Sequence, residues 1–549
     1  MGRHIMQEDV NVVSVTSMGA KGDGVTDDTQ AFIDALQYLK SIGGGILEVP
    51  VKETSYVMDG HAVLVDNVTI RSDGAVIEKT TSSTAYYTFI SLGGTKKGYG
   101  AGASNVVFDG LTFKGSFSKG KSISITLHHS KDVVFRNCKF VETVFGGHTI
   151  DLGGCQNVTV DSCEFIGFKQ EIGREYAEAI QIDHSTAEGN TGMDDLSGYD
   201  GLPSINVTVK NCKFLPITIG GVTYPAPNPL GSHSRVDGQY LRNITFKNNV
   251  VQDGAPYPSG SGSSVYASGW LHFHCAEDIH IEDNEFINTT GSQSRAIGIW
   301  GASTGILMSD VGVVSPTYSN ITPVITHDVS IKGNTFRGFK AEASGVGIVS
   351  VSGVDANSKQ YFSSNISIED NTFIDCFTAN TTNDNTSSDC ISLDKVRVSN
   401  ISRNYASSVR RLVYATNSSM IKISHNQMTG AYFVPVSANT STDVEANFNQ
   451  VDDSIGGFYF RAINGVNIIG NTIRNGKGTT GYAASVAFNG CSLIQSRGNI
   501  LPGPVDSSSD TGISLYGSCS KGVIKDNLIY GYSSKSIHIS TDSTDITTS

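Results

Sequence analysis

NVTVDSCEF, residues 157–165, is the stretch that decides the fold, because closely similar phrases return along the chain. Each phrase alternates apolar and polar residues, then has a polar turn containing Asn or Cys and a closing aromatic or aliphatic residue. Other copies are DVVFRNCKF (132–140), NVTVKNCKF (206–214), DVSIKGNTF (328–336) and NISIEDNTF (365–373). Alternation with a period of two is typical of a half-buried strand. The sequence therefore predicts one strand-and-turn unit repeated along most of its length.

The spacing of these units predicts how they are arranged. The turn residues Asn404, Asn426, Asn449 and Asn471 follow one another at intervals of 22 or 23 residues, and longer intervals contain the same unit plus an insertion. A period of this size indicates a solenoid, in which each coil buries its apolar face only against its neighbours. Stacked coils place equivalent residues ~4.8 Å apart. We therefore expect the aligned Asn side chains to hydrogen-bond to one another as a ladder.

The first part of the chain has a different pattern. Residues 18–50, MGAKGDGVTDDTQAFIDALQYLKSIGGGILEVP, contain Asp27 or Asp28 as a helix N-cap and a stop at Gly43–Gly45. The apolar positions between them are Phe32, Leu36 and Leu39. The pattern predicts a single helix followed by a strand. Such a helix would cover the open end of the solenoid core.

This N-terminal stretch resembles a known family. GAKGDGVTDDTQAFIDAL followed by GGGILEVP is similar to the N-terminal signature of the pectate-lyase-like right-handed parallel β-helix superfamily. The family includes polygalacturonase-type glycosidases, polysaccharide lyases and phage tail-spike depolymerases. The resemblance implies an all-β, right-handed, single-stranded parallel β-helix with a short N-terminal α-helical cap. The polygalacturonase motifs, an Asn-Thr-Asp and an Asp-Asp pair followed by Gly-His-Gly, are absent as phrases, which argues against pectin as the substrate.

The expected organisation is one elongated repeat domain. Residues 1–7 look like a remnant of an expression tag, and 8–50 are the cap and first coil. Residues 51–540 are the β-helix, and 541–549 are a C-terminal tail. Loops rich in Gly, Pro, Ser and Asn interrupt the coils mainly within 166–390, and such loops on a rigid scaffold are where sites are usually built.

Composition and charge exclude several partners. The 549 residues carry a net charge of −13, whereas a surface that binds nucleic acid or anionic membrane needs clustered Lys and Arg. No run of 18 apolar residues occurs and no signal peptide is visible, so we expect no membrane span. Of the 9 cysteines, Cys138, Cys163 and Cys212 occupy equivalent places in the repeat. This placement favours small buried core residues over disulfides or zinc ligands, and with it synthesis in a reducing compartment.

Strand parity predicts which side chains point away from the core. Where Ile150 and Leu152 point inward, Asp151 points outward, because side chains alternate along a strand. The same argument places Asp183 outward in EAIQIDHS, with Glu178 at the entry of that strand. Two carboxylates on neighbouring coils could act as the acid and base, or acid and nucleophile, of a glycosidase. The candidate catalytic residues are therefore Asp151, Glu178 and Asp183.

Other outward positions supply candidate substrate-binding residues along the same exterior groove. Arg235 could hold an anionic substituent. The side chains of Trp270 and Trp300 could stack on sugar faces, although packing in an apolar environment is an equal alternative for these two Trp residues. Thr126 and His128 share the groove by the same count. The candidate binding residues are His148, Gln181, His233, Arg235, Trp270, His272, His274 and Trp300.

The function predicted from these residues is hydrolysis of a bacterial surface or extracellular polysaccharide by a phage or prophage tail component. Alternatives are a polysaccharide lyase with His or Arg235 as its base, a teichoic-acid phosphodiesterase assisted by a divalent cation, and a glycan-binding fibre without catalysis. No cofactor is required by the main prediction and no metal site is assigned. We expect a homotrimer on a virion tail or at a cell surface. If Asp151 and Asp183 are not catalytic, Glu175 and Glu178 are the next candidates.

Overall fold

The computed structural model describes most of the chain. Its described residues are 11–80, 87–120, 124–144, 148–169, 178–189, 196–255, 269–292, 294–339, 347–376, 389–454, 456–475, 484–503, 511–532 and 535–549. The chain divides into two compact units: unit 1 comprises Met1–Pro258 and Ile306–Ser319, and unit 2 comprises Ser259–Gly305 and Asn320–Ser549. None of the helices in the described ranges has the length and apolar character needed to cross a membrane.

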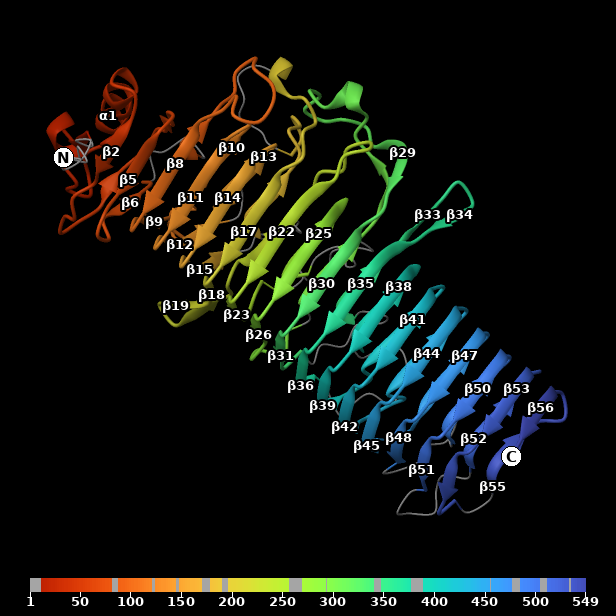
Figure 1. The fold of residues 1–549 in the computed structure, drawn as a ribbon. Helices are drawn as coiled ribbons and strands as arrows, with labels where there is room; N and C mark the ends of the chain where they lie inside the picture. The colour runs from red at the N-terminus through yellow and green to blue at the C-terminus, as the bar shows by residue number, and fades with distance from the viewer. Residues whose placement is uncertain are drawn as a thin grey trace, which may run out of the picture. The chain divides into compact units, whose positions relative to one another are not determined.

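In the described part of unit 1, most strands form three parallel sheets (Figure 1). The first contains β1 (Val12–Ser14), β2 (Gly45–Glu48), β5 (Val68–Arg71), β8 (Ser104–Asp109), β11 (Lys131–Arg136), β14 (Gln156–Asp161), β17 (Ile205–Lys210) and β22 (Leu241–Lys247). The second contains β3 (Tyr56–Val57), β6 (Val76–Glu78), β9 (Thr112–Lys114), β12 (Lys139–Val144), β15 (Glu164–Lys169), β18 (Lys213–Leu215) and β23 (Val250–Gln252). The third, called the site sheet below, contains β4 (Ala62–Val63), β7 (Tyr87–Ser91), β10 (Ser124–His128), β13 (Ile150–Gly153), β16 (Glu178–Asp183) and β21 (Asn228–Gly231).

The described strands of unit 2 repeat this arrangement. One sheet contains β25 (Ala276–Glu282), β30 (His327–Lys332), β35 (Ser363–Glu369), β38 (Val396–Ser402), β41 (Ser419–Ser424), β44 (Thr442–Asn447), β47 (Asn464–Ile469), β50 (Ser492–Arg497), β53 (Ser520–Lys525) and β56 (Thr544–Thr548). Another contains β26 (Glu285–Ile287), β31 (Thr335–Arg337), β36 (Thr372–Cys376), β39 (Tyr405–Val409), β42 (Gln427–Ala431), β45 (Gln450–Ser454), β48 (Thr472–Asn475), β51 (Ile500–Pro502) and β54 (Leu528–Tyr530). The last contains β24 (Leu271–His274), β27 (Ile297–Trp300), β32 (Gly347–Ser352), β37 (Asp389–Asp394), β40 (Val413–Thr416), β43 (Val436–Asn439), β46 (Phe458–Arg461), β49 (Ala484–Asn489), β52 (Thr511–Tyr516) and β55 (Lys535–Ile539).

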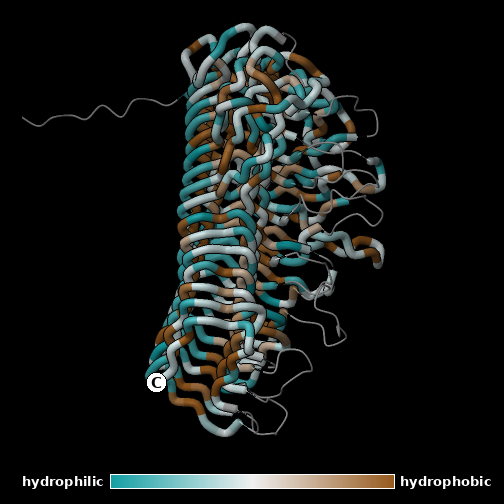
Figure 2. The backbone as a smooth tube through the Cα atoms, turned by 90° about the vertical axis from the view of Figure 1, so that its right-hand side faces the viewer, coloured by the Kyte–Doolittle hydropathy of each residue, from teal (hydrophilic) through white to brown (hydrophobic). Residues whose placement is uncertain are grey.

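Short elements decorate the coils. They are the hairpins β19 (Ile217–Ile219) with β20 (Val222–Tyr224) and β33 (Val354–Ala356) with β34 (Lys359–Tyr361), the pair β28 (Ala302–Gly305) and β29 (Ser319–Val324), and the 3₁₀ turns η1 (Val15–Met18), η2 (Leu196–Gly198) and η4 (Met308–Asp310). Figure 2 shows the coils as stacked turns along which hydrophobic and hydrophilic stretches alternate. This alternation is what a core lined by one side of each strand requires.

The repeated phrases align as the sequence predicts. The closing residues Phe140, Phe165 and Phe214 are register partners on successive coils. Their rings stack with centroids 4.8 and 4.7 Å apart, the spacing of paired strands. All 9 cysteines are buried free thiols, which confirms that Cys138, Cys163 and Cys212 are core residues. The solenoid predicted from the period is therefore present in detail.

The Asn ladder is also confirmed, within unit 2. From Asn284 onward, the backbone N–H and the side-chain amide of each ladder residue both donate to the Oδ1 atom of the Asn on the next coil, up to Asn527. Its members are Asn284, Asn334, Asn371, Asn404, Asn426, Asn449, Asn471, Asn499 and Asn527. These bonds satisfy buried amides that would otherwise cost free energy.

The predicted cap is helix α1 (Thr29–Ser41), which lies beside β2 in Figure 1. It buries Phe32, Leu36 and Leu39 completely. Asp28 is the N-cap by position, while the carboxylate of Asp27 accepts the Thr29 N–H at 3.0 Å. The helix ends at the predicted glycines. Gly44 has φ 121° there, and a side chain on it would meet the Asn67 carbonyl oxygen at 2.4 Å.

Candidate functional site

The site sheet places the predicted carboxylates on neighbouring strands of unit 1. Asp151 on β13 is the register partner of Gln181 on β16, and Asp183 is the partner of Gly153. Ile150, Leu152, Ile180 and Ile182 are fully buried in the core. The predicted parity is therefore correct, and Asp151 and Asp183 point away from the core. They stand two residues apart in register, so they lie on a diagonal and not directly opposite each other.

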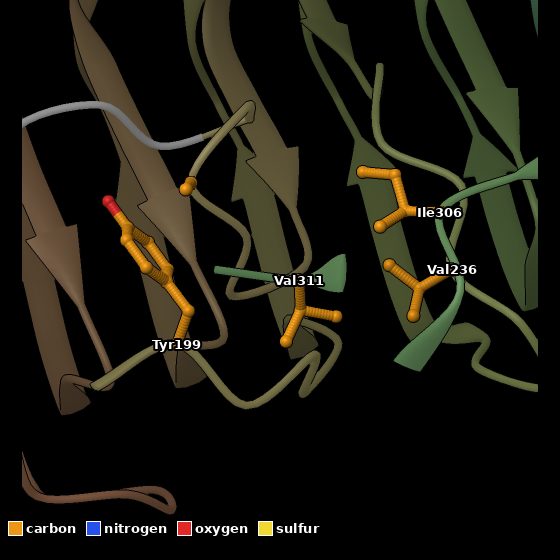
Figure 3. Close-up of a cluster of buried hydrophobic side chains, with 5 residues drawn as sticks. Tyr199, Val236, Ile306 and Val311 are labelled. Atoms are coloured by element: carbon orange, nitrogen blue, oxygen red, sulfur yellow. The ribbon is translucent and has the colours of Figure 1, made fainter. Parts of the chain in front are cut away.

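Inserted segments cover the outer surface of this sheet. Residues 184–189, 196–204, 232–240 and 306–318 form what we call the loop cluster, which has a small hydrophobic core of its own. That core contains Ala187, Tyr199, Val236, Ile306 and Val311, of which the last four are labelled in Figure 3. Val236 and Ile306 form a β-bridge, and the Ala187 N–H donates to the Val311 carbonyl at 2.8 Å. The insertions therefore fold as a packed layer.

The predicted catalytic carboxylates are buried although Asp151 and Asp183 face away from the core, and segments of the loop cluster contact Asp183 and Glu178 directly. The exposed fractions are 9% for Asp151, 1% for Glu178 and 0% for Asp183. Parity along a strand shows which face a side chain is on, but it carries no information about what covers that face. The prediction that these residues line an open groove differs from the structure for this physical reason.

Asp183 has a clear structural connection to the next coil. Its Oδ1 atom accepts the backbone N–H of His233 at 2.8 Å and of Ser234 at 2.9 Å, and Gln181 donates its amide to Oδ2. Gln181 also donates to the carbonyl of Gly189 at 2.9 Å. Burial raises the pKa of Asp183, while the nearby His233 and these hydrogen bonds oppose the rise. The carboxylate thus fixes the segment after β21 onto β16.

A second group brings three chemically versatile side chains of successive coils together. Glu178 begins β16, His148 stands just before β13, and His233 follows β21. The Oε2 atom of Glu178 lies 3.1 Å from His233 Nε2 and 3.5 Å from His148 Nδ1. The two imidazole rings lie 5.3 Å apart. We call these residues the His–Glu–His cluster.

The electrostatics of this cluster are set by its carboxylate. Burial by itself lowers the pKa of His233, but the charge and hydrogen bond of Glu178, with the charges of Asp183 and Asp151, raise the pKa to about 9. The side chains of His148 and His233 are 20% and 19% exposed, whereas that of Glu178 is fully buried. The two imidazoles are therefore partly exposed, whereas the carboxylate that they contact is buried.

Arg235 belongs to a third group, which lies at the surface of the loop cluster. Its guanidinium carbon is 4.6 Å from the centre of the Tyr318 ring, and the Tyr318 hydroxyl donates to Glu188 Oε2 at 2.9 Å. Burial raises the pKa of Glu188, and the hydrogen bond from Tyr318 opposes the rise. Burial and the neighbouring Glu188 raise the pKa of Tyr318, which keeps its hydroxyl a donor. We call these residues the Arg–Tyr–Glu group.

The remaining predicted residues lie in unit 2, where the two Trp side chains differ from each other. Trp270 is 1% exposed and packs on Phe339 at 4.8 Å, so the apolar-packing alternative describes it and the predicted sugar platform does not. His272 is buried. Trp300 is half-buried, with His274 stacked at 5.2 Å and an interplanar angle of 27°.

The sequence did not identify Glu188 and Tyr318 as candidate site residues. It also placed His128 in the groove, where the structure shows a buried side chain. Both missed residues lie in the insertions that the sequence identifies as working loops, which was the available signal. His128, predicted to share the groove, is buried, and its Nε2 lies 3.1 Å from Ser185 Oγ. Burial lowers the pKa of His128 to about 3. Glu175, the reserve catalytic candidate, lies outside the described residues.

Comparison with known proteins gives the class of the fold. A family described as "Right handed beta helix region" matches residues 101–310. Plasmin and fibronectin-binding protein A of Streptococcus pneumoniae is 28% identical in an alignment 275 residues long, which covers 43% of this chain and 35% of that protein. The match thus spans about a third of the relative's length.

Two solved structures are similar over a longer part of the chain. The crystal structure of PfbA, a surface adhesin of Streptococcus pneumoniae, has a TM-score of 0.58 at 18% identity and covers 79% of this chain and 92% of that chain. A tailspike protein of E. coli bacteriophage HK620 has a TM-score of 0.52 at 13% identity and covers 92% of this chain and 78% of that chain. The chain is a right-handed parallel β-helix, and the predicted fold class is confirmed.

Proposed function

We propose that the protein is a surface glycan-binding β-helix whose binding surface lies on the loop cluster of unit 1, and that it binds without cleaving. The observation that carries this proposal is the burial of the three predicted catalytic carboxylates. Asp183 in particular accepts two backbone N–H groups and a side-chain amide. A carboxylate held this way has few lone pairs left for a substrate proton or a sugar carbon. The arrangement suits a scaffold better than a pair of reacting groups.

The accessible polar groups are suited to sugar recognition. Arg235 offers a planar set of donors that can grip a carboxylate, sulfate or phosphate substituent. Glu188 is exposed and can accept from sugar hydroxyls, and Tyr318 holds both residues in place. His148 and His233, whose side chains are 20% and 19% exposed, add donors beside the same sheet. We therefore propose a glycan with at least one anionic substituent as the ligand.

A surface location is supported by the relative whose sequence is 28% identical, which by name binds plasmin and fibronectin. A glycan ligand is supported by a similar fold, that of the HK620 tailspike protein, which has been solved in complex with a hexasaccharide. The net charge of −13 adds that an anionic ligand must be recognised locally, because the chain as a whole repels it.

Binding to a panel of neutral and anionic bacterial and host glycans, with plasmin and fibronectin included, tests the proposal. We expect retention of an anionic glycan and a loss of about tenfold or more in affinity for Arg235→Ala. Arg497→Ala, which removes an exposed Arg from β50 of unit 2, is the matched control and should bind as the wild type. Retention of a host protein by wild type and Arg235→Ala alike, without any glycan, would show that the ligand class is wrong.

Hydrolysis is a second candidate because of one observation. Glu188 is exposed as a residue, but its carboxyl group is partly buried, which raises its pKa, and the charge of Asp183 raises the pKa further. A raised pKa is what a general acid needs. If the protein cleaves its glycan, Glu188→Gln should reduce the rate by about a hundredfold or more, with binding retained. Reducing-end release measured for both proteins distinguishes this candidate.

A further inference from the structure

The His–Glu–His cluster has the composition of a metal site. His148, Glu178 and His233 are separated by 30 and 55 residues in sequence, and the winding of the coils brings them together. Each offers one ligand atom, and the three atoms lie within 4.8 Å of one another. Among the described residues, this is the one cluster of three or more His, Cys, Asp or Glu side chains with this spacing.

The distances in the cluster match those around a tetrahedral ion. Zinc bonded at about 2.0–2.2 Å to imidazole nitrogen and carboxylate oxygen holds its ligand atoms about 3.3–3.5 Å apart. The carboxylate oxygen of Glu178 is 3.1 Å from one imidazole nitrogen and 3.5 Å from the other. Small shifts of the two rings therefore suffice to admit an ion between the three groups.

The donor set also selects the kind of metal. Calcium and magnesium take oxygen ligands almost exclusively, and two imidazoles with one carboxylate are a poor match for them. Two His and one Glu are a known three-ligand set for zinc, with a fourth position left for water or another ligand. We propose that His148, Glu178 and His233 bind one zinc ion.

The surroundings hold the ligands in place. Glu178 lies in β16, which pairs with β13 and β21 through the backbone hydrogen bonds of the parallel sheet. The backbone N–H of His233 donates to Asp183 Oδ1 at 2.8 Å. His148 Nδ1, the nitrogen nearest to Glu178 Oε2, also lies 3.0 Å from the Glu178 carbonyl oxygen, so a bound ion would replace this contact. Preorganised ligands of this kind lose little conformational entropy on binding.

Zinc binding can be measured without any glycan, so this proposal stands or falls separately from the proposed function. Full-length protein is stripped with a chelator, dialysed and titrated with zinc chloride by calorimetry, and the bound metal is counted by mass spectrometry. We expect about one zinc per chain. Cobalt taken up in its place should show the visible absorption of a tetrahedral site, and that readout reports on ligand geometry.

Variants assign the ligands. Glu178→Gln and His148→Ala should each weaken zinc binding by about a hundredfold or more. His327→Ala is the matched control, because His327 lies 3.0 Å from Glu277 at a more exposed site in unit 2. His148 is 20% exposed, so its variant should fold even where the change at the buried Glu178 does not. No zinc uptake by the wild type, or uptake unchanged in His148→Ala and reduced in His327→Ala, would overturn the proposal.

Discussion

The Asn ladder of unit 2 and the His–Glu–His cluster of unit 1 both bring polar side chains of successive coils together, but they satisfy them differently. In the ladder, each amide is paired with an identical amide on the next coil, as between Asn404 and Asn426. In the cluster, a buried carboxylate is paired with two imidazoles. Identical neighbours pair amide with amide from coil to coil, whereas the unlike neighbours of the cluster bring a buried carboxylate and two imidazoles together.

The largest loss of stability is expected in unit 2 where a buried carboxylate is paired with side chains of a different kind. Asp389 is buried and is paired with Arg410 at 2.6 Å and Arg411 at 3.2 Å. Asp389→Asn leaves two buried guanidinium groups without their carboxylate and should cost about 3–5 kcal/mol, measured as a lower unfolding midpoint. The control is Asp355, whose side chain is 64% exposed and pairs with Lys395 at 3.2 Å, and Asp355→Asn should cost less than about 1 kcal/mol because Lys395 keeps its contact with Asp394. Equal effects of the two changes would contradict the argument.

A somewhat smaller loss should follow from breaking the ladder. Asn404→Ala removes the acceptor of the Asn371 N–H and amide and the donor to Asn426. Buried groups left without partners cost about 1–3 kcal/mol each, so we expect about 3 kcal/mol in total after relaxation. Thermal unfolding followed by circular dichroism measures it. Asn464→Ala, at an exposed position of β47, is the control, and if it destabilised the protein as much, the ladder would have no special role.

A third test uses the pH dependence of unit 1. The pKa of His233 is raised to about 9, above the unfolded value of about 6.5. Its contribution to stability is therefore fully present below pH 6.5 and is lost as the pH rises through 9. In chelator-treated protein, wild type should exceed His233→Gln by on the order of 2 kcal/mol at pH 6, and the difference should vanish near pH 10. A difference that stays constant with pH would show that Glu178 does not hold a charged imidazole.

The smallest effect concerns Trp300 in unit 2. A side chain on Gly298 would meet the Trp300 ring at 2.1 Å, so Gly298→Ala must displace the indole. We expect a cost of about 1 kcal/mol and a shift in tryptophan emission, which is readable because the chain has only 2 Trp. Gly456→Ala, where the nearest atom is 3.6 Å away, should change neither quantity. An unchanged emission spectrum in Gly298→Ala would mean that the ring does not rest on this glycine.

The features predictable from the sequence were those that repeat. The Asn positions and the stacked Phe residues follow from periodicity, because each coil has the same pattern of buried and exposed positions. The helix with its glycine stop follows from local propensity. The outward orientation of Asp151 and Asp183 followed as well. Homotrimer formation stays a prediction, for which light scattering is the direct measurement.

The parts that were not predictable depend on contacts between unlike segments. The loop cluster buries Asp183 through segments far apart in sequence, such as Ile306 on Val236. The approach of His233 to Glu178 across 55 residues likewise depends on two insertions whose paths no period describes. Trp270 is buried against Phe339, a contact that strand parity cannot reveal.

The proposed function requires that the protein binds a glycan and leaves it intact. The most direct measurement is mass spectrometry of a glycan from the panel after long incubation with a stoichiometric amount of wild-type protein. We expect the glycan to be recovered from the complex at its original mass. Shorter products carrying an added water, or products with an unsaturated end, would show a hydrolase or a lyase and would contradict the account.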